Sequence, residues 1–174
     1  MAGWTIVGQP PETKKYVAIV APHTSNWDFF IFICMKFALR LKVNFIGKHT
    51  IFVGPIGWAL RRLGGIPVNR TANNNVVDQI VDSFKQRDNM IFALSPEGTR
   101  SYKDHWKSGF YHIALKADVP VQFCYLDKST KSVGFGPMIQ LTGDKNKDLE
   151  TIKAFFQDKK GIKPDLFSDI RFRD

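Results

Sequence analysis

The stretch Ala21-Pro22-His23-Thr24-Ser25-Asn26-Trp27-Asp28 joins a predicted strand to a predicted helix. Before it, Tyr16 to Val20 is apolar and rich in β-branched residues, as in a buried strand, and after it the apolar run from Phe29 to Leu41 predicts a helix. His23 therefore lies at a strand exit, and Asp28 lies in the first helical turn. Ser25 or Asn26 is suited to be the N-cap of that helix.

The spacing of His23 and Asp28 allows a short loop to bring the two side chains together. Five residues apart on one helix they would diverge by about 140°, so the loop must supply the contact. A carboxylate that orients an imidazole makes it a general base, able to take a proton from a hydroxyl or a water. The alternative is that Asp28 only complements the helix dipole and His23 is an ordinary loop histidine.

The composition predicts one domain over residues 1–174, because 174 residues with 44% hydrophobic content can form a sizeable core. Cys34 and Cys124 lie in apolar segments, and we expect buried, unpaired thiols in a reducing compartment, not a disulfide or a metal site. No signal peptide is recognisable, and the run from Trp27 to Leu39 is too short to span a bilayer. We therefore expect a protein that is not integral to the membrane.

Positive charge is concentrated in the middle of the chain. The formal charge is +9, and the region from Lys36 to Lys116 holds thirteen Lys and Arg against five acids. Such a field suits an anionic ligand or an anionic surface, either phospholipid or nucleic acid, although scattered solvated lysines would give the same count. Nucleic acid is disfavoured as a partner, because the basic residues form no helix stripe or recognisable reading motif.

Strands and helices alternate along the chain, which predicts a mostly parallel central sheet flanked by helices in a single α/β domain. Residues 1–13 form a short lead-in, either amphipathic or loose, in which Trp4 would suit a membrane interface. Ile51 to Leu63 combines large apolar residues with an arginine pair, as in a membrane-interface segment or an ordinary amphipathic helix. The other predicted strands are Val43–Ile46, Gly64–Arg70, Met90–Leu94, Val119–Leu126 and Ser132–Leu141, and the other predicted helices are Val76–Phe84, His105–Ala117 and Leu149–Lys160 within a C-terminal region of residues 144–174.

Several polar residues follow predicted strands, at the carboxyl ends where open α/β sheets bind ligands. Gly98 would allow a tight turn, and Arg100 has a fork suited to phosphate. Glu97 would either bind a glycerol-like hydroxyl or hold Arg100 in place. The candidate binding residues are Lys48, Arg70, Glu97, Gly98, Thr99 and Arg100, in one crevice with His23.

Four blocks in order resemble the signatures of the glycerolipid acyltransferase family, which includes the 1-acylglycerol-3-phosphate acyltransferases. The first signature of the family is H-x4-D, which His23 to Asp28 matches, and Gly64 to Arg70 resembles the second signature. Pro96 to Ser101 resembles the third signature, and Val119-Pro120-Val121 resembles the fourth. The resemblance covers roughly residues 15–125.

The resemblance implies transfer of a fatty acyl group from acyl-CoA or acyl carrier protein to a lysophospholipid hydroxyl. His23 would act as general base with Asp28 orienting it, without an acyl-enzyme and without a cofactor beyond the thioester co-substrate. Arg70, Glu97, Gly98, Thr99 and Arg100 would bind the phosphate and glycerol of the acceptor. We add, from composition, that the apolar Phe29 to Leu41 region helps to form the acyl path.

Two departures leave the acceptor open, since Ser95 replaces a bulky apolar residue and Asn69 replaces a common acid. Without the N-terminal hydrophobic segment of many relatives, the chain is expected to bind the cytoplasmic face of an anionic membrane peripherally, through its basic middle and the Trp58 region. The alternatives are another lysolipid acceptor, a thioesterase, or a non-catalytic basic module that binds lipid.

Overall fold

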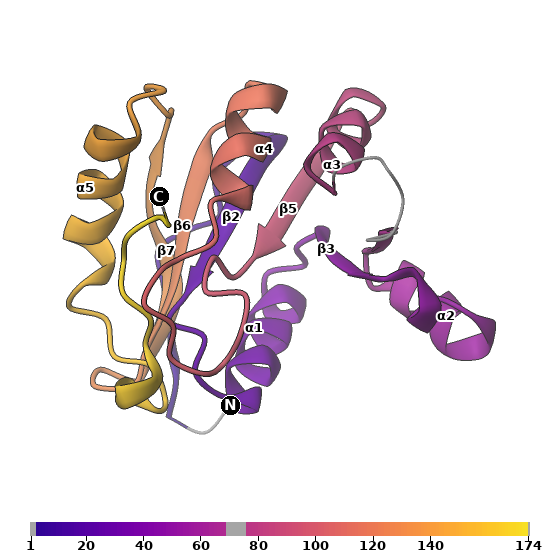
Figure 1. Cartoon of the computed structure of the whole chain (residues 1–174). Helices are drawn as coiled ribbons and strands as arrows, with labels where there is room; N and C mark the ends of the chain where they lie inside the picture. The colour runs from indigo at the N-terminus through magenta and orange to yellow at the C-terminus, as the bar shows by residue number, and fades with distance from the viewer. Residues whose placement is uncertain (1–2, 69–75, 174) are drawn as a thin grey trace.

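The computed structural model describes residues 3–68 and 76–173 and contains one seven-stranded sheet (Figure 1). The strand order is β1-β7-β6-β2-β5-β3-β4, and every neighbouring pair is parallel except β6 and β7. This architecture confirms the predicted α/β fold with a mostly parallel sheet. The strands are β1 (Thr5–Val7), β2 (Lys15–Ala21), β3 (Val43–Lys48), β4 (Gly65–Val68), β5 (Met90–Leu94), β6 (Val121–Asp127) and β7 (Ser132–Ile139).

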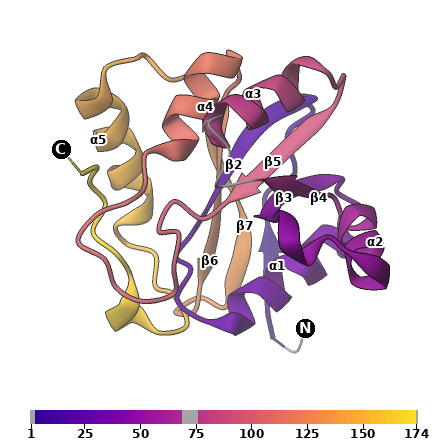
Figure 2. The same cartoon turned by 45° about the vertical axis from the view of Figure 1, so that its right-hand side comes forward.

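Helices cover both faces of the sheet (Figures 1 and 2). Alternate residues of β2 such as Val17 and Ile19 belong to a core shared with α3, α4 and α5. On the other face, α1 packs through Ile31 and Met35 against β6 and β7. The helices are α1 (Asn26–Ala38), α2 (Gly54–Arg62), α3 (Val76–Lys85), α4 (Gly109–Ala117) and α5 (Lys145–Phe156), with short 3-10 turns η1 (His49–Ile51) and η2 (Pro164–Leu166).

The first residues of the chain differ from the expectation of a loose or amphipathic lead-in. β1 pairs in parallel with β7, with Thr5 opposite Ser132, and so forms an edge of the sheet. Trp4 and Ile6 pack against the α1 side of the core. A three-residue strand is too short to show an alternating pattern, and its partner lies more than a hundred residues away, so the sequence could not reveal it.

Three predicted helices begin at other residues, because local caps set the starts of two of them and a contact with a distant segment sets the start of the third. α1 begins three residues early, since Ser25 caps it as predicted, and α5 begins four residues early, since the Asp144 side chain accepts from two backbone N–H groups. By contrast, α4 begins at Gly109 and not at His105. Trp106 is held in an isolated bridge with Phe172, and its N–H donates to the Arg171 carbonyl, so residues 105–107 are not helical.

The structure can also be compared with the predictions for the cysteines and for the long apolar segments. Cys124 is buried as predicted, whereas Cys34 is exposed on the outer side of α1, and both are free thiols. Burial raises the pKa of Cys124 to about 12. None of the helices that the structure describes has the length and apolar character needed to cross a bilayer.

Candidate active site

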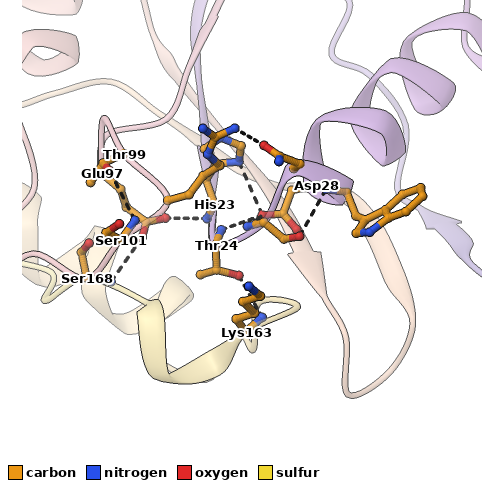
Figure 3. Close-up of polar contacts among 12 residues, drawn as sticks. His23, Thr24, Asp28, Glu97, Thr99, Ser101, Lys163 and Ser168 are labelled. Atoms are coloured by element: carbon orange, nitrogen blue, oxygen red, sulfur yellow. Dashed lines mark hydrogen bonds and ion pairs between the residues drawn. The ribbon is translucent and has the colours of Figure 1, made fainter.

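His23 and Asp28 meet where β2 ends and α1 begins, as their spacing predicts (Figure 3). The His23 Nδ1 atom lies 3.5 Å from Asp28 Oδ2. The Asp28 side chain is 0% exposed, whereas the His23 side chain is 25% exposed. A buried carboxylate therefore faces one nitrogen of a partly accessible imidazole, and Nε2 is the nitrogen left for a substrate.

The Asp28 carboxylate is held by the backbone of its own loop. Its Oδ2 atom accepts from the N–H groups of Thr24, at 2.6 Å, and Ser25, at 2.7 Å. In return, the Ser25 hydroxyl accepts from the Trp27 N–H at 3.2 Å and from the backbone N–H of Asp28, and the latter bond completes a capping box. The same carboxylate thus caps the N-terminus of α1 and contacts the imidazole, so Asp28 has both of the features that the sequence offered as alternatives.

His23 also lies on the wall of an apolar cavity between α1 and the sheet. The cavity has a volume of about 210 Å³ and extends from His23 along β2 and β5 to the start of β3. Small residues such as Ala18 and Ala93 leave its middle open. Its lining also includes Tyr16, Val20, Phe29, Phe32, Ile33, Met35, Lys36, Leu41, Val43, Phe45, Ile91, Leu94, Ser95, Cys124 and Phe135.

Glu97 lies on the other side of His23, and its carboxylate accepts hydrogen bonds from backbone groups (Figure 3). Its side chain is 1% exposed. The Oε1 atom accepts from the His23 N–H at 2.5 Å, and Oε2 accepts from the Ser168 N–H at 3.2 Å. The carboxylate therefore joins two backbone segments, while the Arg100 guanidinium donates to Asn26.

Burial raises the pKa of Glu97 to about 7, although the hydrogen bonds from the His23 and Ser168 N–H groups oppose this shift. In the unfolded chain the group titrates near 4.5. The folded state therefore binds a proton that the unfolded state has lost between these two values. The stabilisation linked to this proton is complete below about pH 4.5 and is lost as the pH rises through about 7.

We expect this group alone to lower the free energy of unfolding by about 3 kcal/mol between pH 4.5 and pH 7. Urea unfolding of the wild type and of Glu97→Gln at pH 5 and pH 8 measures the effect, because glutamine does not titrate. The wild type should lose more stability than the variant on going to pH 8. An equal loss of stability in both proteins would mean that Glu97 does not cause the pH dependence.

The structure places the other predicted binding residues as follows. Gly98 has φ +64° and forms the predicted turn, and the Thr99 hydroxyl accepts from the Ser101 N–H. Arg100 is exposed, and its guanidinium donates to the side-chain oxygen of Asn26 at the start of α1. Lys48 is the last residue of β3 and not a residue beyond it. Arg70, with Asn69, lies outside the described residues.

The sequence interpretation missed the contacts that the C-terminal segment makes with the His23 loop. The Lys163 N–H donates to the Thr24 hydroxyl at 3.0 Å, and Ser168 meets Glu97 (Figure 3). Both contacts use backbone N–H groups of a polar segment. Backbone donors carry no residue signature, so nothing in the sequence pointed to them.

Comparison with known proteins places this geometry in a family. The family model described as Acyltransferase matches residues 6–126. Chloroplastic 1-acyl-sn-glycerol-3-phosphate acyltransferases of Brassica napus and Arabidopsis thaliana are each 35% identical, over 106 and 109 residues respectively. These matches cover 57% and 58% of this chain, and the chain spans 30% of the length of each relative.

A solved structure has the same fold. The 1-acyl-sn-glycerophosphate acyltransferase PlsC of Thermotoga maritima aligns with a TM-score of 0.57 at 19% identity. The alignment covers 82% of this chain and 64% of that one. The resemblance carried by the four sequence blocks is thereby confirmed, and the chain belongs to the acyltransferase family.

Proposed function

We propose that this chain transfers a fatty acyl group from acyl-CoA or acyl carrier protein to the free hydroxyl of a lysophospholipid, 1-acylglycerol-3-phosphate. The observation that carries the proposal is the position of His23 on the wall of an apolar cavity, with buried Asp28 behind its Nδ1 atom. The names of the two plant relatives support this choice of acceptor. The proposed reaction needs no cofactor beyond the thioester co-substrate.

In the proposed reaction, His23 Nε2 takes the proton of the acceptor hydroxyl while its oxygen attacks the thioester carbonyl. The tetrahedral intermediate then collapses, the carbon–sulfur bond breaks, and the imidazolium returns the proton to the departing thiolate. Asp28 stabilises the imidazolium and fixes its orientation. General-base help of this kind contributes roughly 10²–10⁴-fold, and alignment of the two substrates contributes much of the remainder.

Two side chains that line the cavity, Cys124 and Ser95, could in principle form an acyl-enzyme, but the surroundings of both favour direct transfer. The raised pKa of Cys124 keeps it a thiol near neutral pH. Ser95 has a buried hydroxyl that lacks a hydrogen-bonding partner among the described residues. A serine nucleophile requires an adjacent base, so both residues favour attack by the acceptor itself.

We assign the substrates to opposite sides of His23. The acyl chain would occupy the apolar cavity, whose α1 wall comes from the predicted acyl region. The acceptor phosphate and glycerol would lie over the exposed loop that contains Gly98, Thr99 and Arg100. Lys48 and Arg70 remain proposed phosphate ligands, whereas Glu97 is removed from that set because its carboxylate is buried.

We infer that an anionic membrane surface is the partner that delivers the acceptor. α1 and the α2 region present exposed apolar side chains, and residues 29–77 hold seven Lys and Arg and no Asp or Glu. Between the C-terminal ends of these helices lies a hollow lined by five cations and one acid. The exposed apolar residues are Trp27, Phe29, Phe30 and Phe37 on α1, and Ile51, Val53, Ile56 and Trp58 in the α2 region.

Aromatic residues beside cations suit the headgroup layer of a bilayer. Trp58 is 62% exposed and lies under the Arg62 guanidinium at 4.9 Å. Figures 1 and 2 both place α2 at the side of the molecule away from α5. Because both cysteines are free thiols, we propose the cytoplasmic face of the membrane.

We expect Trp58→Ala to weaken binding to vesicles that contain anionic phospholipid by about tenfold, because about 1.4 kcal/mol of apolar burial is lost. Raising the salt from 0.1 to 0.5 M should weaken binding of the wild type as well, since the cations are screened. Sedimentation with vesicles measures both effects. Leu115→Ala, at an exposed position of α4, is the matched control. If Trp58→Ala and Leu115→Ala bound the vesicles equally well, Trp58 would not be part of the membrane-binding surface.

We also propose that residues 1–174 act as a single acyltransferase domain. β1 and the C-terminal segment both pack on the same sheet and on the loops that it carries. The C-terminal segment lies outside residues 6–126, the region that matches the family model, and removing it would break its contacts with these loops.

The proposed function is tested by acyl transfer, followed by mass spectrometry. The donors are a long-chain acyl-CoA and the corresponding acyl carrier protein, and the acceptors are a panel of lysolipids headed by lysophosphatidic acid. A diacyl product would establish the transferase and name its acceptor. Free fatty acid without a diacyl product would indicate a thioesterase. Vesicle binding without either product would indicate a lipid-binding module.

A further inference from the structure

The segment from Gly161 to Ser168 lies outside the region that matches the family model, yet it contacts the His23 loop directly (Figure 3). Two independent sets of contacts connect it to His23. One passes through Thr24, the next residue in the chain. The other passes through Glu97.

The first set is a close approach of the segment's backbone to side chains of the His23 loop. Thr24 is buried, and its hydroxyl accepts from the Lys163 N–H at 3.0 Å. Gly161 lies so near that a Cβ atom there would be 2.5 Å from Thr24 Oγ1, 2.9 Å from Thr24 Cγ2 and 3.0 Å from Pro22 Cβ. Only glycine fits this position without displacing the loop.

The second set is the bridge made by the Glu97 carboxylate. One oxygen accepts from the His23 N–H and the other from the Ser168 N–H, and both Glu97 and Ser168 are buried. The Ser168 hydroxyl in turn accepts from the Lys103 N–H at 3.2 Å. Because a buried carboxylate is costly to leave unpaired, displacement of Ser168 would disturb the bond to His23.

The segment is itself fixed to the body of the protein. The Lys160 carbonyl accepts from the Lys128 N–H at 2.7 Å, just after β6. The Phe167 ring packs against Trp106 with their centroids 6.3 Å apart, and the Asp169 N–H donates to the Lys103 carbonyl. It can therefore serve as a rigid support.

We propose that Gly161–Ser168 is a positioning element of the active site, which sets the place of His23 through Thr24 on one side and Glu97 on the other. Its residues contact no reacting atom. The proposal rests on the proposed function only in that His23 is the base. The element acts through Gly161 and through the backbone N–H groups of Lys163 and Ser168.

Gly161→Ala tests the element. Its φ is not in the left-handed region, so alanine adds only the clash with the loop. A displacement of the base by a fraction of an ångström should lower kcat by about tenfold and leave the KM for the thioester donor unchanged. Gly109→Ala is the matched control, because a Cβ atom there meets nothing within 4 Å and α4 lies on the other face.

A readout independent of substrates is the nitrogen and proton NMR signals of the imidazoles. The chain has four histidines, and the signals of His23 are assigned by their loss in His23→Ala. In Gly161→Ala the His23 signals should shift and those of His112 should not, whereas Gly109→Ala should leave the His23 signals unchanged. This measurement decides the inference even if no acyl transfer is detected in the wild type.

Thr24→Ala is the second variant, since it removes the acceptor for Lys163 and adds no atoms. It should also shift the His23 signals and lower kcat, and combining it with Gly161→Ala should add little, because the two atoms that lie closest to the added Cβ are gone. If Gly161→Ala fails to fold, Thr24→Ala decides alone. Unchanged kcat and unchanged His23 signals in the folded variants would overturn the proposal.

Discussion

Replacing His23 with alanine is expected to lower kcat for acyl transfer by about 10²–10⁴-fold, the usual contribution of a general base. Alanine keeps the backbone N–H that donates to Glu97, so the imidazole is lost and the bridge to the C-terminal segment is retained. The thermal unfolding of the variant should therefore stay close to that of the wild type. Steady-state kinetics with lysophosphatidic acid and a long-chain acyl-CoA measures the loss.

His112→Ala is the matched control, since this histidine lies on α4, on the opposite face of the sheet. It should retain the activity of the wild type. Asp28→Asn should lose activity as well, because the charge that faces His23 Nδ1 disappears while a side chain of the same size remains. Wild-type kcat in His23→Ala would exclude this histidine as the base.

Enlarging Ala93 to phenylalanine is expected to lower kcat/KM for long-chain donors by about 10²-fold. Ala93 lines the middle of the apolar cavity, and its register partner on β2 is Ala18. A phenyl ring there would fill the space beyond the first part of the acyl chain. If about four methylene groups of the acyl chain can no longer be buried, at about 0.8 kcal/mol each, the donor loses about 3 kcal/mol of binding free energy.

The same variant provides its own internal comparison. A short-chain donor ends before the ring, so its kcat/KM should change little. Ala154→Phe, on an exposed position of α5, adds the same ring outside the cavity and should preserve the rate with both donors. An equal loss with short and long donors would mean that the cavity does not hold the acyl chain.

Much of the fold could be predicted because its strands are buried on both faces. Met90 to Leu94 is an uninterrupted apolar run and forms β5 with the predicted bounds. The meeting of His23 and Asp28 could also be predicted, since Ser25 is a strong capping residue and starts the helix three residues before the aspartate. Both predictions rest on interactions between neighbours in the sequence.

Interactions between distant segments account for the errors. Trp106 lies in an apolar and aromatic stretch that resembles a helix start, but Arg171 and Phe172 hold its backbone in a bridge. Glu97 lies three residues before Arg100 in the sequence, and it was predicted either to bind a glycerol-like hydroxyl or to hold Arg100 in place. Its partners are backbone groups of His23 and Ser168, 74 and 71 residues away.

These long separations have a consequence for how the protein matures during translation. The bond between Lys163 and Thr24 spans 139 residues. Because contacts so far apart along the chain form only after a large loss of chain entropy, we expect the His23 loop to be among the last parts to order. A nascent chain in which residues 161–168 are still inside the ribosome would hold the family signatures and most of the sheet, yet it would lack the finished site. Acyl transfer would then begin only after residue 168 has emerged.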